Sequence, residues 1–130
     1  MIDRADLKKL ARERIRDAEA LYRARRYHGA IYICGYAVEL ALKARICQTL
    51  RWSQYRDTDS ELRDLKTHKL EVLLRLSGIE NRVYGSALPA WSTVKTWGPE
   101  SRYKPLSSAT QLDARYMIDA ARVLLRILAP

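Results

Sequence analysis

The run AIYICGYAVELALKA, residues 30–44, decides how this chain folds. From Ala30 to Val38 it is apolar on almost every side, interrupted only by Gly35 and then by Glu39. Nine such residues are far too few to cross a lipid bilayer, because a membrane-spanning helix needs about 20. We therefore expect the run to lie within a helix, from Tyr27 to about Trp52, that is covered on several sides at the centre of a bundle.

A β-strand is the rival interpretation for Ile31 to Ile33. The length of the apolar segment and its alanine-rich continuation, Glu39 to Ala44, favour a helix. Before this segment, Asp3 can cap a helix that runs to about Arg25. One face of that helix is an apolar stripe at three- and four-residue steps, made of Leu7, Leu10, Ala11, Ile15, Ala18, Leu21 and Tyr22.

The second half of the chain predicts shorter helices and one more long one. Thr67 can cap a short helix from Lys69 to Leu76, which Ser77-Gly78 ends. Another short helix is expected from about Pro89 to Trp97, with Pro89 in its first turn.

Ser107 or Ser108 then caps a last long helix, after a loop at Ser101–Leu106. The apolar face expected for this helix consists of Leu112, Tyr116, Ala120, Val123 and Ile127. We see no convincing strand. The sequence therefore predicts one all-α domain over residues 1–130, an up-down bundle of four to five helices.

Charge and cysteine usage indicate the class of partner and the compartment. The formal net charge of +9 and the pI of about 9.8 favour contact with polyanions such as nucleic acid. Cys34 and Cys47 lie in apolar helical surroundings, and no signal-peptide pattern is visible, so we expect buried thiols and a cytoplasmic protein. Two histidines and two scattered cysteines give no zinc spacing, and no glycine-rich phosphate loop is present. We expect neither a metal nor a cofactor.

Three segments resemble motifs of the HEPN (higher eukaryotes and prokaryotes nucleotide-binding) domains. YHGAIY at residues 27–32 followed by GYAVELALKA at 35–44 resembles the second helix of that family. KTHKL at residues 66–70, followed by Leu73 and Leu74, resembles the start of a later helix. WGPESRY at residues 97–103 resembles the segment before the last helix of some members.

The resemblance, which covers nearly the whole chain, implies a bundle of four or five helices. It also implies a homodimer and a role beside a minimal nucleotidyltransferase in toxin–antitoxin or defence systems. Active members are metal-independent RNases. Their signature is an arginine, four to six residues and then a histidine, near the start of the last long helix, with two copies meeting across the dimer.

Arg63 and His68 have the spacing of that signature, but they lie ahead of the third helix rather than the last one. In the catalytic interpretation, His68 moves a proton from a ribose 2′-hydroxyl while Arg63 stabilises the phosphate. In the structural interpretation, the ring of His68 bonds to neighbouring backbone or side chains.

Two further pairs are candidate ligand-binding residues. Glu39 and Lys43 are four residues apart on one helical face. They form either an ion pair in or beside the core or part of a ligand pocket. Lys43, Arg102 and Arg45 are candidate partners of the Glu39 carboxylate. Arg102 and Tyr103 follow a Gly-Pro break, where they can hold a phosphate and stack on a base. Alternatively, Arg102 pairs with Glu39 or Glu100 while Tyr103 fills a gap between helices.

The sequence thus favours a HEPN-like binding module, dimeric, that works with RNA, a nucleotide or a partner protein such as a nucleotidyltransferase. The alternative is a metal-independent RNase toxin that uses Arg63 and His68. A purely structural partner of a nucleotidyltransferase is a third hypothesis.

Overall fold

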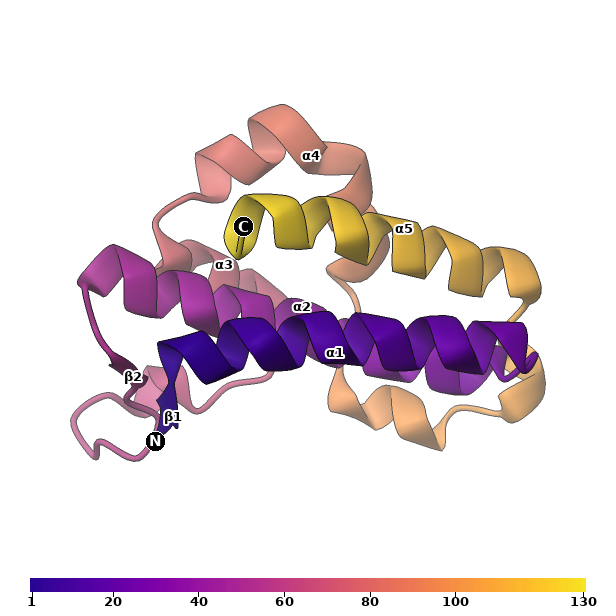
Figure 1. The fold of residues 1–130 in the computed structure, drawn as a ribbon, viewed down its shortest axis with the longest axis horizontal. Coiled ribbons are helices and arrows are strands. Elements are labelled where there is room, and N and C mark those ends of the chain that lie inside the picture. The colour runs from indigo at the N-terminus through magenta and orange to yellow at the C-terminus, as the bar shows by residue number, and fades with distance from the viewer.

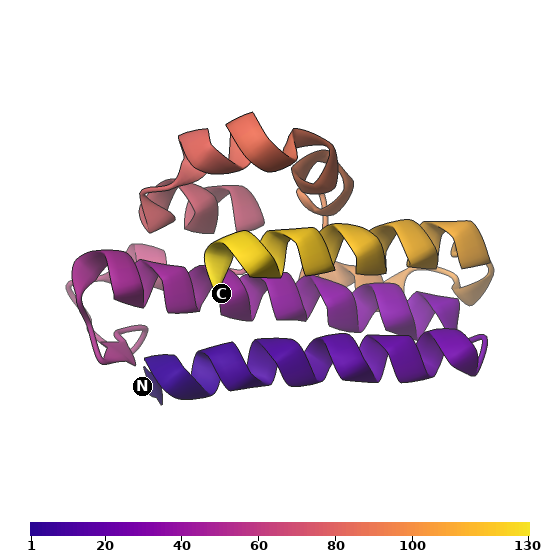
Figure 2. The ribbon, with the colours of Figure 1, turned by 45° about the horizontal axis from the view of Figure 1, so that its top comes forward.

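Three long helices form the body of the protein in the computed structural model, which describes residues 1–130. They are α1 (Arg4–Arg23), α2 (Tyr27–Leu50) and α5 (Gln111–Leu128), and they lie side by side in Figures 1 and 2. The chain reverses between α1 and α2, whereas α5 runs in the same direction as α2 (Figures 1 and 2). None of the helices has the length and apolar composition needed to cross a membrane.

Shorter elements connect α2 to α5. Two helices, α3 (Leu70–Ser77) and α4 (Glu80–Val94), lie over one half of the long helices (Figure 2). Single 3₁₀ turns occupy Arg63–Leu65, Pro99–Tyr103 and Leu106–Ser108. The only strands are the two-residue segments β1 (Ile2–Asp3) and β2 (Gln54–Tyr55), which pair antiparallel. The expected all-α bundle is therefore confirmed.

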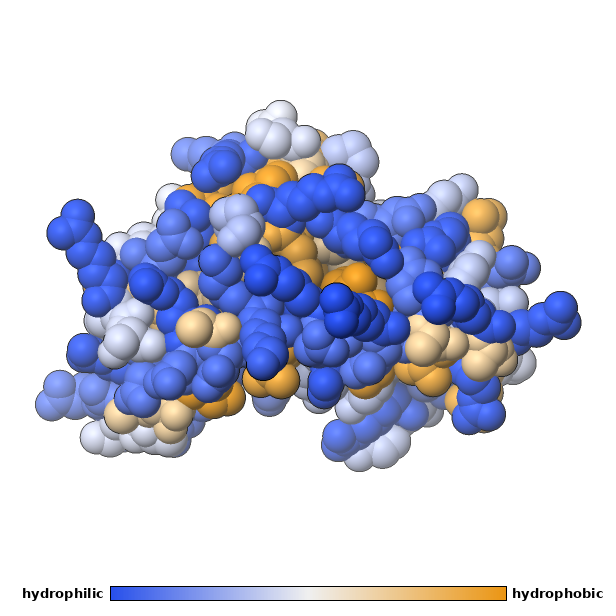
Figure 3. All heavy atoms as spheres, in the orientation of Figure 1, coloured by the Kyte–Doolittle hydropathy of each residue, from blue (hydrophilic) through white to orange (hydrophobic).

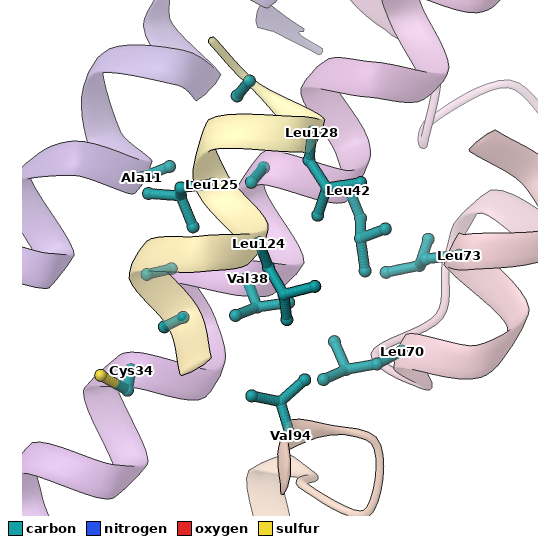
Figure 4. Packing of buried hydrophobic residues seen from close by; sticks show 14 of the residues in the cluster. Ala11, Cys34, Val38, Leu42, Leu70, Leu73, Val94, Leu124, Leu125 and Leu128 are labelled. Atoms are coloured by element: carbon teal, nitrogen blue, oxygen red, sulfur yellow. The ribbon is translucent and has the colours of Figure 1, made fainter. Parts of the chain in front are cut away.

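Helix α2 is the central element, as its composition predicts. Its buried residues lie on several sides of the helix, and α1, α3 and α5 all pack against it. Figure 4 shows Val38 and Leu42 from α2 among side chains of α3 and α5. These residues belong to one continuous cluster of 32 buried side chains. The small residues of α2, such as Ala37 and Ala41, let its neighbours approach closely.

The apolar stripe expected on the first helix is confirmed, whereas only Ala120 and Ile127 of the five residues expected to form the apolar face of the last helix pack in the core. Leu7, Ala11, Ile15 and Ala18 are buried on α1. On α5, however, Leu112, Tyr116 and Val123 are 58%, 58% and 37% exposed. The buried face of α5 consists instead of Ala114, Met117, Ile118, Ala120, Ala121, Leu124, Leu125 and Leu128. Helix α5 carries two apolar stripes, and the one with more alanines fits closest against the bundle.

The caps of two helices also differ from expectation. Thr110, not Ser107 or Ser108, caps α5: its hydroxyl accepts from the backbone of Asp113, whose carboxylate accepts from the backbone of Thr110. Ser108 instead closes a 3₁₀ turn by donating to the Pro105 carbonyl. The N-cap position of α3 is Lys69, and Thr67 accepts a hydrogen bond from its backbone N–H.

Helix α4 begins nine residues before the expected Pro89. It starts at Glu80 and is kinked at Ala87, whose φ of −146° is not helical. A proline lacks the N–H that would continue the helical ladder and disfavours helical backbone just before it. Pro89 therefore marks the first turn after the kink, and the helical turns from Glu80 to Ser86 were missed.

A charged contact between α1 and α5 predicts a pH-dependent stability. The Glu19 carboxylate accepts from Arg115 at 3.0 Å and Arg122 at 2.7 Å, and its side chain is 15% exposed. The hydrogen bond from Arg115 and the charges of both arginines lower the pKa of Glu19 below its ordinary value. The ionised form therefore stabilises the fold above the unfolded-state pKa, and this contribution is lost as pH falls through the lowered, folded-state pKa. We expect Glu19→Gln to lower the free energy of unfolding by about 1–2 kcal/mol at pH 7.

Urea unfolding at pH 7 and at pH 3 measures this effect. The difference between wild type and Glu19→Gln should shrink at the lower pH. Asp17→Asn is a matched control, since the Asp17–Arg14 pair is exposed and should contribute less than about 0.5 kcal/mol. Equal losses for Glu19→Gln at both pH values would contradict the assigned role of the carboxylate.

Candidate functional site

A stripe of polar and aromatic side chains follows one face of α2. Tyr32, Tyr36, Glu39 and Lys43 are separated by steps of four, three and four residues, which places them on the same side of a helix. The hydroxyls of Tyr32 and Tyr36 are 3.5 Å apart. This hydrogen bond and burial raise the pKa of Tyr36 to about 12. Tyr36 therefore stays neutral at physiological pH, whereas the same hydrogen bond lowers the pKa of Tyr32.

Glu39 is the charged centre of this stripe. The residue is only 3% exposed, yet both of its carboxylate oxygens have partners. Lys43 Nζ donates to Oε2 at 3.2 Å, and His68 Nδ1 lies 2.8 Å from Oε1. The predicted ion pair with Lys43 is thus present. The other candidate partners, Arg45 and Arg102, make no ion pair with Glu39.

His68 lies just before α3, with its ring held by Glu39 and its side chain 56% exposed. A carboxylate only accepts hydrogen bonds, so Nδ1 carries a proton and donates to Glu39. In the neutral ring, Nε2 is then a bare acceptor. A buried carboxylate that fixes the tautomer of an exposed histidine is the arrangement by which a histidine acts as a general base.

His68 lines a cleft of about 740 Å³ between α3 and the segment that follows α4. Four cationic side chains line the same cleft, namely Lys66, Lys69, Arg75 and Lys95. Only two carboxylates line it, those of Glu71 and Glu100. An excess of cations over acids in a concave surface favours anionic ligands.

Trp97 forms one wall of the cleft and packs on α2. Its ring centroid is 4.8 Å from that of Tyr36 and 6.4 Å from that of Tyr32. The indole lies directly over Gly35, where an added Cβ would come within 2.0 Å of the ring. Gly35 therefore interrupts the apolar run because only a residue without a side chain leaves room for Trp97.

The model of one protein family, the HEPN domain, matches residues 5–129 of this sequence. The chain belongs to the HEPN domain family. No curated protein and no solved structure matches it. The family resemblance seen in the sequence is thereby confirmed over nearly the whole chain.

In this HEPN domain, Arg63 and His68 are not joined by a hydrogen bond. Arg63 is exposed in the 3₁₀ turn Arg63–Leu65 and has no ion-pair partner, whereas His68 bonds to Glu39. The other histidine, His28, donates from Nε2 to the Ser101 carbonyl oxygen at 2.9 Å, since a carbonyl can only accept.

Arg102 and Tyr103 lie on the 3₁₀ turn Pro99–Tyr103, which continues from the cleft-lining segment. Tyr103 is 76% exposed, so it does not fill a gap between helices. The Arg102 guanidinium lies 4.8 Å from the centroid of the Tyr103 ring and pairs with neither Glu39 nor Glu100. This leaves a cation and an aromatic face accessible to a ligand.

Sequence reasoning missed the cleft itself and the role of Trp97 in it. The four cations of the cleft are scattered along the sequence from residue 66 to residue 95. Nothing in their spacing indicates that they come together. For Trp97 a signal was available, because a lone glycine inside a buried helix indicates a close approach by another group. The sequence does not show which group that is.

Proposed function

We propose that this HEPN domain is a binding module for RNA or a nucleotide, and that the cleft beside His68 is the binding site. The observation that carries this proposal is the excess of cations in the cleft, four cationic side chains together with His68 against two carboxylates. Phosphate groups supply the negative charge that such a surface attracts, and lysine and arginine contacts to phosphates dominate the affinity of proteins for nucleic acids.

Arg102 and Tyr103 extend the site toward a base. They lie immediately after the cleft-lining segment 95–100, and the ring of Tyr103 is exposed. Single-stranded RNA is commonly bound by stacking of unpaired bases on aromatic side chains. In this proposal, the cleft binds phosphates and Tyr103 stacks on a neighbouring base. The Glu39–Lys43 pair keeps His68 in place without touching the ligand.

A salt titration of binding tests the cleft. Binding of a fluorescent single-stranded oligoribonucleotide is measured by anisotropy at increasing salt. For single strands, each phosphate contact adds about −0.7 to the slope of log K against log salt. We therefore expect Lys69→Gln/Lys95→Gln to make the slope shallower by about 1.4 and to weaken binding.

Lys9→Gln/Arg12→Gln is the matched control. It removes the same charge from exposed positions on α1, which packs against α2 and α5. Its slope should stay that of wild type. Equal changes in both double variants would indicate that only the net charge matters for binding. They would contradict binding of RNA in the cleft.

RNA cleavage is a second candidate function, favoured by the geometry of Glu39 and His68. The bare Nε2 of His68 would take the proton of a ribose 2′-hydroxyl. The resulting oxygen would attack the adjacent phosphorus and expel the 5′-oxygen. The 5′-oxygen would take a proton from water and leave as a 5′-hydroxyl, with a 2′,3′-cyclic phosphate on the other fragment. Arg63 would stabilise the charge that develops on the phosphate, as the Arg-x₄-His spacing implies.

Incubation with RNA in the presence of EDTA tests cleavage. If the chain is an RNase, His68→Ala should lower the rate by about 10²–10⁴-fold. Arg63→Lys should also slow cleavage, because lysine keeps the charge but not the planar fork. His28→Ala is the matched control and should keep the rate. If the wild-type protein binds RNA but does not cleave it, the RNase function is contradicted and only the binding module remains.

We also infer a homodimer or a complex with a partner such as a minimal nucleotidyltransferase, acting in the cytoplasm. The exposed apolar stripe of α5, Leu112, Tyr116 and Val123, supports an assembly. Figure 3 also shows apolar atoms at the surface between α4 and α5. Light scattering should report about twice the chain mass of 15.1 kDa for a homodimer. A strict monomer at high concentration would contradict the homodimer.

A further inference from the structure

A groove between α1 and α5 is lined by four arginines and by no carboxylate side chain. Its volume is about 460 Å³, and the other residues of its lining are apolar. The arginines are Arg12 and Arg16 from α1 and Arg122 and Arg126 from α5. None of these residues lines the cleft beside His68, so the groove is a separate concentration of positive charge.

The four arginines form two facing pairs. The members of each pair are four residues apart, which places them on one helix face, about 6 Å apart along the axis. Helices α1 and α5 run antiparallel (Figure 1), and Glu19, about one turn beyond Arg16 on α1, contacts Arg122. Arg16 therefore lies near Arg122. Arg12 lies near Arg126, across two packed helices whose axes are typically about 8–10 Å apart.

Acidic residues outside the groove balance two of these charges. Arg122 donates to the Glu19 carboxylate at 2.7 Å, and Arg16 donates to Glu13 at 3.4 Å. The side chain of Glu19 is 15% exposed and also accepts from Arg115. This shared, largely buried carboxylate holds the Arg122 guanidinium at the edge of the groove.

No carboxylate balances the other two charges, those of Arg12 and Arg126. Both residues are exposed, and neither forms an ion pair. Like charges four residues apart on a helix repel each other, so each arginine pair of the groove lowers the stability of its helix. An anion bound between the pairs would relieve this repulsion, and a concave surface with an excess of cations attracts anions.

The size of the groove and its arginines favour an oligophosphate. The planar fork of a guanidinium donates two parallel hydrogen bonds to one phosphate. In an oligophosphate, neighbouring phosphates share a bridging oxygen, so several negative charges fit in a volume of about 460 Å³. In RNA, a ribose separates each phosphate from the next, so fewer charges fit. Glutamates of an acidic peptide carry one charge each and lose rotamer freedom when they bind.

We propose that the groove between α1 and α5 binds a linear oligophosphate, either free or as the 5′-triphosphate of a nucleotide. Phosphate oxygens accept from Arg12 and Arg126 at one end of the groove and from Arg16 and Arg122 at the other. This binding does not depend on whether the cleft beside His68 binds RNA.

Isothermal titration calorimetry of wild type and of Lys69→Gln/Lys95→Gln tests the groove. The double variant removes two cations of the cleft, so binding of anions there does not obscure the result. In both proteins, we expect tripolyphosphate to bind at least about tenfold more tightly than orthophosphate, because each added phosphate meets a further guanidinium. ATP that binds as tightly as tripolyphosphate would identify nucleotides as a source, and ATP that binds more weakly would identify free oligophosphate.

Single variants locate the binding. Arg126→Gln should weaken tripolyphosphate binding by about tenfold, and Arg126→Lys by a smaller factor, since lysine keeps the charge but not the fork. Arg23→Gln is the matched control, because it removes the same charge from an exposed position in the last turn of α1. Circular dichroism should show an unchanged fold for all three variants, since both positions are exposed.

Three results would each overturn the proposal. In the first, orthophosphate binds as tightly as tripolyphosphate. In the second, Arg126→Gln weakens binding no more than Arg23→Gln does. In the third, an oligoglutamate of the same net charge, or a 5′-hydroxyl oligoribonucleotide, displaces tripolyphosphate at equal concentration. That result would assign the groove to an acidic protein segment or to RNA.

Discussion

Replacing Gly35 by alanine should destabilise the protein by about 3 kcal/mol, at the upper end of the usual cost of overpacking. The new Cβ would lie within 2.0 Å of the Trp97 indole, far closer than two carbon atoms can approach. Trp97 would have to leave its place beside Tyr36, or the segment after α4 would have to move away from α2. Urea unfolding followed by circular dichroism measures the loss.

Gly85→Ala is the control, because an added Cβ there meets nothing within 4 Å. Gly85 lies in α4, where alanine is favoured over glycine, so this change should stabilise the protein by up to about 1 kcal/mol. If Gly35→Ala were as well tolerated as Gly85→Ala, Trp97 would not pack on α2, and its place as one wall of the cleft would be contradicted.

Replacing Glu39 by alanine should cost about 2–4 kcal/mol, because it removes the one carboxylate that Lys43 and His68 share. The side chain of Lys43 is only 14% exposed, and without Glu39 its charge keeps only a contact with the Tyr55 ring, 5.2 Å from the centroid. His68 would also lose the acceptor that fixes its ring. We therefore expect both the stability and the affinity for RNA to fall.

The double variant Glu39→Leu/Lys43→Leu separates these two effects. Replacing a buried ion pair by apolar side chains of similar volume is often neutral for stability, so most of the lost free energy of unfolding should return. The affinity for RNA should stay low, since His68 remains without its partner. A double variant as unstable as Glu39→Ala would show that the carboxylate stabilises the fold through groups other than Lys43.

The sequence predicts those features that depend on neighbours along the chain. The central helix follows from a long apolar run, and the Glu39–Lys43 pair from a four-residue step on a helix. The choice of which face of α5 is buried does not follow from neighbours along the chain. Its sequence carries two apolar stripes, and only the shape of the surrounding bundle decides that Leu112 and Tyr116 stay outside.

Contacts between distant segments account for the rest of the site. His68 is 29 residues from Glu39, and the sequence indicates only that its ring could bond to something nearby. The cleft needs Lys66 and Lys95 on facing segments, which depends on the path of the chain through α3 and α4. That path was the weakest part of the sequence prediction, because α4 begins at Glu80 and bends at Ala87.

Cross-linking tests the central claim most directly. A single-stranded oligoribonucleotide that contains 4-thiouridine is bound to the protein, irradiated and mapped by mass spectrometry after proteolysis. We predict cross-links within residues 66–75 and 95–103, with Tyr103 prominent, and their loss in Lys69→Gln/Lys95→Gln. Cross-links confined to α1 or to the exposed stripe of α5, and unchanged in that variant, would contradict binding in the cleft.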